Sequence, residues 1–138
     1  MNIEIRDYND KDLEGVNKVL NSCFSREKKC QFDKKLFKEI VAVIDGNVCG
    51  YVLLYKIFNP IRERYFYYVN YVCVDEKYRG EGIAYMMMEY AYELAKKDDC
   101  MYLELTCSYH RVAAHRLYES LGYIKRESDI YRKELVWY

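Results

Sequence analysis

Two glycines, Gly80 and Gly82, stand where a strand pattern passes into a helix pattern. The β-branched run that ends at Val74 predicts a buried strand, and the apolar residues after Gly82 recur at helical spacing. Backbone N–H groups in the first turn of a helix have no partner within the helix, and this end of the helix dipole is positive. Glycine removes the side chains that would keep a phosphate away from these groups. The segment 72–84 therefore predicts a loop that binds a pyrophosphate.

Two better-known phosphate-binding loops do not fit this segment. The P-loop needs Gly-x-x-x-x-Gly-Lys-Ser/Thr, and the chain has no such run. The dinucleotide-binding pattern Gly-x-Gly-x-x-Gly needs a third glycine where this chain has Tyr85. Lys77-x-x-Gly80-x-Gly82 remains as the candidate, and a simple turn after a strand is the alternative.

The run Lys77-x-x-Gly80-x-Gly82 resembles motif A of the GNAT superfamily of acyl-CoA-dependent N-acyltransferases, whose pattern is Gln/Arg-x-x-Gly-x-Gly/Ala. Arg-Gly-x-Gly-Ile-Ala at 79–84 is typical of that family, whereas Lys77 departs from the usual Gln or Arg but keeps a donor. The resemblance implies acetyl-CoA as the acyl donor, with its pyrophosphate on the loop and its pantetheine arm along the preceding strand. The residues that it assigns to cofactor binding here are Val72, Cys73, Val74, Lys77, Arg79, Gly80, Glu81, Gly82, Ile83 and Ala84.

A second motif follows about thirty residues later, in a predicted helix that ends at Gly122. Ala114-x-x-x-Tyr118-x-x-x-Gly122-Tyr123 resembles motif B of the same superfamily. The resemblance implies that Tyr118 is the catalytic residue that donates a proton toward the thiol sulfur. Arg111 stands where the family often has Asn, so the Asn contact cannot be transferred, and Arg111 itself is assigned to cofactor binding.

The general base is the weakest part of this prediction. Many relatives have a glutamate on the strand before the loop, where this chain has Asn70. Two-residue alternation places Asn70 on the same face as Val72 and Val74. An amide does not take up the proton of an ammonium group, so ordered water is one route for deprotonation. The other candidates are Glu104, Asp75, Tyr67 and Tyr71.

The surrounding pattern predicts the elements that position these residues. Strands are expected at 2–8, 40–44, 48–58, 65–74 and 101–106, with helices after Asn9 or Asp10, after Asp33, at 81–97 and at 110–121. The resemblance adds two final strands at 123–127 and 130–137. The expected fold is α/β (α+β) and GNAT-like. It has a mixed, mostly antiparallel sheet of about six to seven strands flanked by about four helices, in one domain over 1–138.

Composition excludes several other classes of function. Twenty-two basic and twenty-two acidic residues balance, which argues against a general nucleic-acid or membrane-surface binder. The six cysteines include no Cys-x-x-Cys pair, so no metal site is assigned. The start of the chain lacks the apolar core of a signal peptide, so we expect reduced cysteines and a cytoplasmic protein.

These observations predict an N-acetyltransferase that transfers the acetyl group of acetyl-CoA to a primary amine by direct attack. The acceptor is left open among a small amine, an amino acid, a polyamine, an aminoglycoside and a protein or peptide amine. Two alternatives remain. One is a non-catalytic acyl-CoA-binding sensor, which Asn70 favours, and the other is a subunit whose open sheet edge serves a homodimer.

Overall fold

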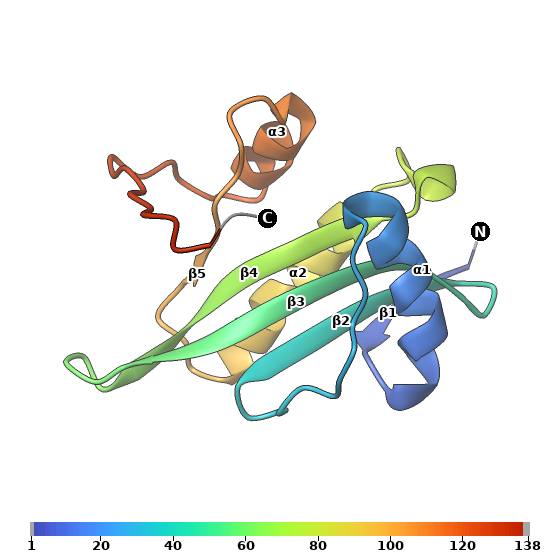
Figure 1. Ribbon diagram of the computed structural model, residues 1–138, viewed down its shortest axis with the longest axis horizontal. Coiled ribbons are helices and arrows are strands. Elements are labelled where there is room, and N and C mark those ends of the chain that lie inside the picture. The colour runs from blue at the N-terminus through green and yellow to red at the C-terminus, as the bar shows by residue number, and fades with distance from the viewer. Residues whose placement is uncertain (1, 137–138) are drawn as a thin grey trace.

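The computed structural model describes residues 2–136, which form a curved five-stranded sheet with helices on both faces (Figure 1). Neighbouring strands follow chain order; the first four are antiparallel, and the last pair is parallel. The strands are β1 (Ile3–Asp7), β2 (Phe37–Ile44), β3 (Asn47–Asn59), β4 (Arg64–Val74) and β5 (Leu103–Glu104). The helices are α1 (Leu13–Phe24), α2 (Ile83–Lys97) and α3 (Val112–Ser120), with short 3-10 turns η1 (Asp10–Asp12) and η2 (Glu76–Tyr78).

The central hairpin forms where its turn residues predict it. Ile44 pairs with Asn47, so only Asp45 and Gly46 lie in the turn. Both have positive φ, 49° and 83°, which is the conformation of a type I′ turn that suits twisted strands. The strands predicted at 40–44, 48–58 and 65–74 are confirmed in β2, β3 and β4, which pair in antiparallel order.

Two apolar clusters hold the helices against the sheet. Helix α1 covers one face through Val16, Val19 and Leu20. Helix α2 covers the opposite face, and Met87 and Ala91 are completely buried there (Figure 1). Helical spacing of these residues gives each helix one apolar stripe, and burying that stripe provides most of its stability.

The helix predicted after Asp33 is wrong. Asp33 begins only a turn, in which its carbonyl accepts hydrogen bonds from the Leu36 and Phe37 N–H groups at 3.0 and 2.9 Å. Phe37 then opens strand β2 and pairs with Tyr55 of β3. The run 40–44 is buried throughout because helices cover both faces of the sheet there, so pairing with β1 and β3 overrides the weak helical spacing.

The C-terminal strands predicted at 123–127 and 130–137 do not form within residues 2–136, and residue 137 lies outside the described part. Ile124, Ile130 and Tyr131 are exposed, so no burial of apolar surface favours pairing. Strand β5, predicted at 101–106, has only two residues and offers a short edge. The described part of the chain therefore has five strands rather than six to seven, and three α-helices rather than about four.

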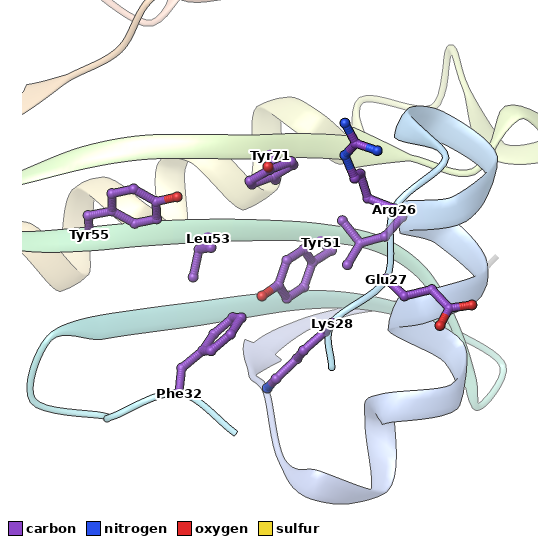
Figure 2. Close-up of a pocket in the computed structure, with 9 residues that line it drawn as sticks. Arg26, Glu27, Lys28, Phe32, Tyr51, Leu53, Tyr55 and Tyr71 are labelled. Carbon is purple, nitrogen blue, oxygen red and sulfur yellow. The ribbon is translucent and has the colours of Figure 1, made fainter. Parts of the chain in front are cut away.

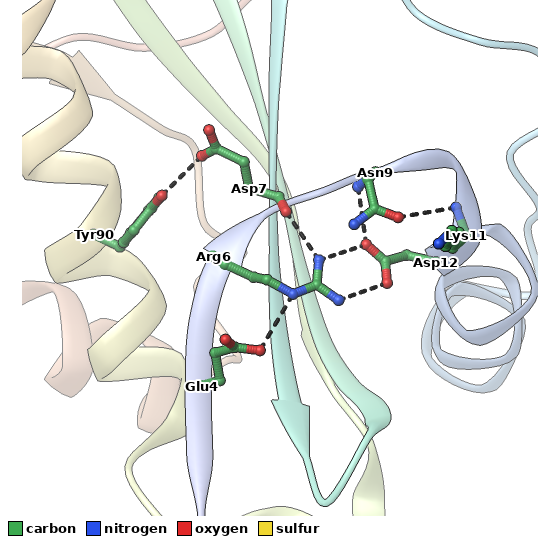
Figure 3. A network of polar contacts seen from close by, with 7 residues as sticks. All are labelled: Glu4, Arg6, Asp7, Asn9, Lys11, Asp12 and Tyr90. Atoms are coloured by element: carbon green, nitrogen blue, oxygen red, sulfur yellow. Dashed lines mark hydrogen bonds and ion pairs between the residues drawn. The ribbon is translucent and has the colours of Figure 1, made fainter.

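A partly buried ion pair joins β1 to the entry of α1 (Figure 3). The Arg6 guanidinium donates to both carboxylate oxygens of Asp12, at 2.7 and 2.8 Å. Asp12 also accepts from the Asn9 N–H at 2.9 Å, and Asn9 in turn accepts from the Lys11 N–H at 3.0 Å. The hydrogen bonds from Arg6 lower the pKa of Asp12, although desolvation opposes them.

We expect Asp12→Asn to lower the free energy of unfolding at pH 7 by about 2 kcal/mol, the usual scale for a hydrogen bond to a charged group. The pKa of Asp12 is lower in the folded state than in the unfolded chain. Its contribution to the free energy of unfolding is therefore complete above about pH 3.9, the pKa of an unfolded Asp, and is lost as the pH falls through the folded pKa. Urea unfolding at pH 7 and pH 2.5 should show the difference between wild type and variant shrinking in acid. Asp10→Asn, at an exposed position in the same turn, is the control; a similar loss in both variants would contradict the prediction.

No helix within residues 2–136 combines the length and the apolar character needed to cross a membrane.

Candidate active site

The glycine loop lies between η2 and the first turn of α2, as the sequence predicts. Gly80 and Gly82 have φ of +85° and +76°, a region that favours glycine. Apart from each glycine and its chain neighbours, no atom of the described residues lies within 4 Å of the position that a Cβ would take there. Asp75 fixes the loop to the sheet, since its N–H donates to the Cys49 carbonyl at 2.7 Å and its carboxylate accepts from the Lys77 N–H at 3.0 Å. The open space above the N–H groups of α2 fits a phosphate.

The side chains around this loop differ in what they can offer a cofactor. Lys77 is exposed, whereas the Arg79 guanidinium turns back to donate to the Val74 carbonyl at 3.3 Å and to contact the Cys23 sulfur at 3.7 Å. Ile83 is buried in the core, so only its backbone N–H is available. Glu81 is exposed and negatively charged, which leaves its backbone as the group suited to a phosphate.

Strand β4 parts from β5 just before the loop. The two strands pair only at Tyr67 with Leu103 and Tyr68 with Glu104, after which the chain from β5 rises away toward α3 (Figure 1). Beyond Tyr68, the edge of β4 that faces away from β3 has no strand partner among residues 2–136. Val72, Cys73 and Val74 lie along this edge, so the structure places all the cofactor residues predicted before η2 beside an open backbone.

A β-bulge interrupts β4 at Tyr71. Leu53 pairs with Asn70 and Tyr51 pairs with Cys73, so two residues of β4 stand opposite one residue of β3. Tyr71 has a φ of 53°, and its N–H donates to the side-chain oxygen of Asn70 at 2.9 Å.

The bulge corrects the predicted position of Asn70. Val72 and Val74 pack with the cluster on the α2 face, but the Asn70 amide donates to the Tyr55 hydroxyl at 3.0 Å, and Tyr55 packs on the α1 face. Asn70 therefore does not share a face with Val72 and Val74, because the extra residue at Tyr71 shifts the two-residue alternation by one.

A cavity of about 190 Å³ lies on the α1 face (Figure 2). Helix α1 contributes only Leu20, whereas the segment 25–36 that follows it and the strands β3 and β4 form most of the wall. Of the residues that line this cavity, only Tyr71 is a candidate from the sequence, as a general base. The two-residue alternation of Tyr51, Leu53 and Tyr55 along β3 is the signal that could have found this face. The cavity is lined by Leu20, Arg26, Glu27, Lys28, Phe32, Tyr51, Leu53, Tyr55 and Tyr71.

A buried ion pair anchors the segment 25–36 against the sheet. The Lys28 ammonium lies 2.8 and 3.1 Å from the two carboxylate oxygens of Glu39, and the Tyr51 hydroxyl donates to the same carboxylate at 2.6 Å. The Lys28 backbone N–H donates to the Asn17 side chain at 2.7 Å, and its carbonyl accepts from that amide at 3.2 Å. Lys28 also lies 3.8 Å from the centre of the Tyr8 ring. Burial and then Glu39 raise the pKa of Tyr51, so this hydroxyl keeps its proton.

The structure separates the four candidates for a general base. Tyr67 is fully buried and donates to Asp98; burial and this contact raise its pKa, so it stays protonated. Asp75 caps η2 through its carboxylate, and Glu104 is exposed on β5. Tyr71 is the candidate that lines the cavity.

Tyr118 lies in α3 and packs with the α2-face cluster that also contacts Val72 and Val74. Its side chain is only 8% exposed, and its ring centre is 5.8 Å from that of Tyr123. Burial raises the pKa of the Tyr118 hydroxyl, and the positive charge of Arg111 partly offsets this effect. Tyr118 therefore stays protonated at neutral pH and can donate a proton. Arg111 is exposed at the N-terminus of α3.

Cysteine and metal chemistry has little support within residues 2–136. All six cysteines are free thiols, and no group of three or more His, Cys, Asp or Glu side chains is placed to bind a metal ion. Burial is the main cause that raises the pKa of Cys73, so the thiol nearest the open edge of β4 is protonated at neutral pH and is a poor nucleophile.

Comparison with known proteins identifies relatives of this chain. The profile of the acetyltransferase (GNAT) family matches residues 4–123. An N-acetylaspartate synthetase from Rattus norvegicus is 36% identical over 85 residues, which cover 60% of this chain and 26% of that protein. A putative acetyltransferase from Agrobacterium tumefaciens str. C58 shares the fold with a TM-score of 0.81 at 20% identity, covering 95% of this chain and 99% of its own. A ribosomal-protein-alanine N-acetyltransferase from Brucella melitensis biovar Abortus 2308 also has a TM-score of 0.81 at 20% identity, covering 97% and 100%.

Proposed function

This chain belongs to the acetyltransferase (GNAT) family, and we propose that it transfers the acetyl group of acetyl-CoA to a primary amine by direct attack. The observation that carries the proposal is the glycine loop at the start of α2, directly after the unpaired edge of β4. The glycine loop suits a pyrophosphate, and the unpaired edge of β4 suits an extended arm that contains amide groups. Acetyl-CoA, when bound, supplies the activated acetyl group.

The cofactor would be held mainly by backbone groups. The N–H groups of Gly80, Gly82 and the first turn of α2 would bind the pyrophosphate, with Lys77 adding positive charge. The edge of β4 at 72–74 offers N–H and carbonyl groups to the pantetheine arm, and one of these N–H groups would polarise the carbonyl that is attacked. We propose that Arg111, which is exposed at the N-terminus of α3, also contacts the cofactor.

The described side chains also support direct attack rather than an acyl-enzyme. Cys73 is buried and protonated, so it offers no thiolate. Tyr118 is protonated and would donate its proton toward the departing sulfur. Asn70 is not a base, so the amine would lose its proton to water at the cavity that Tyr71 lines.

The acceptor would approach from the cavity on the α1 face. Tyr118 and the cavity are on opposite faces of the sheet, so the thioester would have to lie at the unpaired edge of β4 for the acceptor and Tyr118 both to reach it. The name of the rat relative refers to an acetylated amino acid, so amino acids belong first among the acceptors to be tested.

The free cysteines suit a reducing compartment, and we propose a cytoplasmic location.

A non-catalytic acyl-CoA sensor is the second candidate, and the absence of a carboxylate at Asn70 favours it. Thermal-shift titration with acetyl-CoA, followed by CoA release in the presence of a panel of amines, separates the two functions. A raised melting temperature with release of CoA on one class of amine supports the transferase. A raised melting temperature without release on any amine supports the sensor, and no shift would contradict both.

A further inference from the structure

The polar groups of the cavity on the α1 face divide into those that are already paired and those that are available. Lys28 and Glu39 neutralise one another, and the proton of Tyr51 is donated to Glu39. The side chains of Lys28 and Glu39 are 2% and 9% exposed, so this network is closed to a ligand. The groups that a ligand meets must come from the remaining lining residues.

The remaining groups are mostly hydrogen-bond donors. Arg26 is exposed, and its guanidinium has no ion-pair or hydrogen-bond partner among residues 2–136. The Tyr55 hydroxyl accepts from Asn70 at 3.0 Å, which leaves its own proton available. In Figure 2 the Arg26 guanidinium lies on the Tyr71 side of the cavity, whereas the Glu27 carboxylate points away from the aromatic rings. The cavity therefore offers a fixed positive charge and phenolic donors, beside walls of Phe32 and Leu53.

This arrangement suits a negatively charged oxygen group. A guanidinium has several N–H donors in a plane that matches a carboxylate, and charge-assisted hydrogen bonds of this kind are strong. A polycationic acceptor would instead meet Arg26, and the carboxylate of Glu39 is already bound to Lys28. The volume of about 190 Å³ is below the 300–1,000 Å³ that is common for ligand pockets, so the acceptor is small.

We infer that the acceptor is a small amine that carries a carboxylate, such as a single amino acid. Arg26 binds the carboxylate, and the acceptor's side chain contacts Phe32, Leu53 and Tyr55. This inference rests on the proposed function, because an acceptor has meaning only for a transferase. It makes Arg26 a determinant of specificity that lies outside both glycine-loop and tyrosine motifs.

The test compares free amino acids with their carboxamides as acceptors, using CoA release by the 138-residue chain. The amide has nearly the same size and lacks only the negative charge. Arg26→Gln should lower kcat/KM for the free amino acids by about tenfold or more, through KM, while leaving kcat/KM for the amides within about twofold. Arg26→Lys keeps the charge without the planar fork and should recover part of the loss.

Lys29→Gln is the matched control, because Lys29 is exposed in the same segment and does not line the cavity. It should leave both classes of acceptor unchanged. Differences in amine basicity between acids and amides affect every variant equally, so they cancel when variants are compared.

Three results would overturn the inference. One is that Arg26→Gln lowers kcat/KM equally for the free amino acids and their amides. Another is that Lys29→Gln lowers kcat/KM for the free amino acids as much as Arg26→Gln does. The third is a wild-type protein that acetylates other amines but no free amino acid, which would leave the proposed function standing. Failure of acetyl-CoA to raise the melting temperature would instead reject the proposed function, and the inference would fall with it.

Discussion

Gly82→Trp is expected to abolish acetyl-CoA binding, with a loss of affinity of about 100-fold or more. The indole would fill the open space beside the N–H groups of α2, where no described residue other than the chain neighbours of Gly82 lies within 4 Å of the Cβ position. Losing two or more charge-assisted hydrogen bonds accounts for a loss of this size. Isothermal titration with acetyl-CoA would measure the affinity, and circular dichroism would show that the fold is kept.

The hairpin glycine provides a matched control for this variant. Gly46 has a φ of +83°, close to the +76° of Gly82, and also has open space at its Cβ position among the described residues. Gly46→Trp therefore imposes a similar backbone strain, about 1–2 kcal/mol, at a turn outside the glycine loop. We expect both variants to be destabilised and only Gly82→Trp to lose acetyl-CoA. An unchanged affinity in Gly82→Trp would show that the pyrophosphate binds elsewhere.

Tyr118→Phe is expected to lower kcat by about 100-fold while changing acetyl-CoA affinity by less than about threefold, the pattern for loss of a proton donor. The effect is at the low end for general acids because a thiol, with a pKa of about 8.5, leaves readily without help. Steady-state kinetics and cofactor titration on the same preparation would separate the two quantities.

The pH profile adds a second readout for Tyr118. Burial raises its pKa above the usual value of about 10, so the hydroxyl stays protonated throughout the neutral range and loses its proton only in more alkaline solution. Any alkaline fall in kcat that depends on Tyr118 should therefore begin above pH 10 and be absent in the Phe variant.

Tyr123→Phe is the control for the loss of a buried hydroxyl. Tyr123 packs against Tyr118, and its buried hydroxyl has no hydrogen-bond partner among residues 2–136. Burial likewise raises its pKa, to about 12. We expect Tyr123→Phe to keep most of the activity. A weakened affinity for acetyl-CoA with unchanged kcat in Tyr118→Phe would make Tyr118 a packing residue.

Local chemistry explains which parts of the molecule are readable from the sequence. Gly80 and Gly82 adopt positive φ, which few other residues do without cost. Their spacing therefore predicts the loop from local residues alone, without knowledge of the rest of the fold. Asp45 and Gly46 specify their turn for the same reason. The apolar periodicity of α1 and α2 predicts which face of each helix is buried. The apolar stripe can be read from the helix's own residues, whatever element it packs against.

Tertiary structure decided the features that depend on pairing between distant segments. The segment 37–44 becomes a strand because β3, and from Ile40 onward also β1, supply its hydrogen bonds. The bulge at Tyr71 puts Asn70 on the α1 face because register is set by β3. Lys28 and Glu39 are eleven residues apart and look like ordinary surface charges in the sequence. Only folding buries them together, so Arg26 and Glu27 are the charged lining residues that have no ion-pair partner among residues 2–136. The sequence by itself therefore determined the glycine loop, and the packing of strands against one another decided the shape and charge of the cavity on the α1 face.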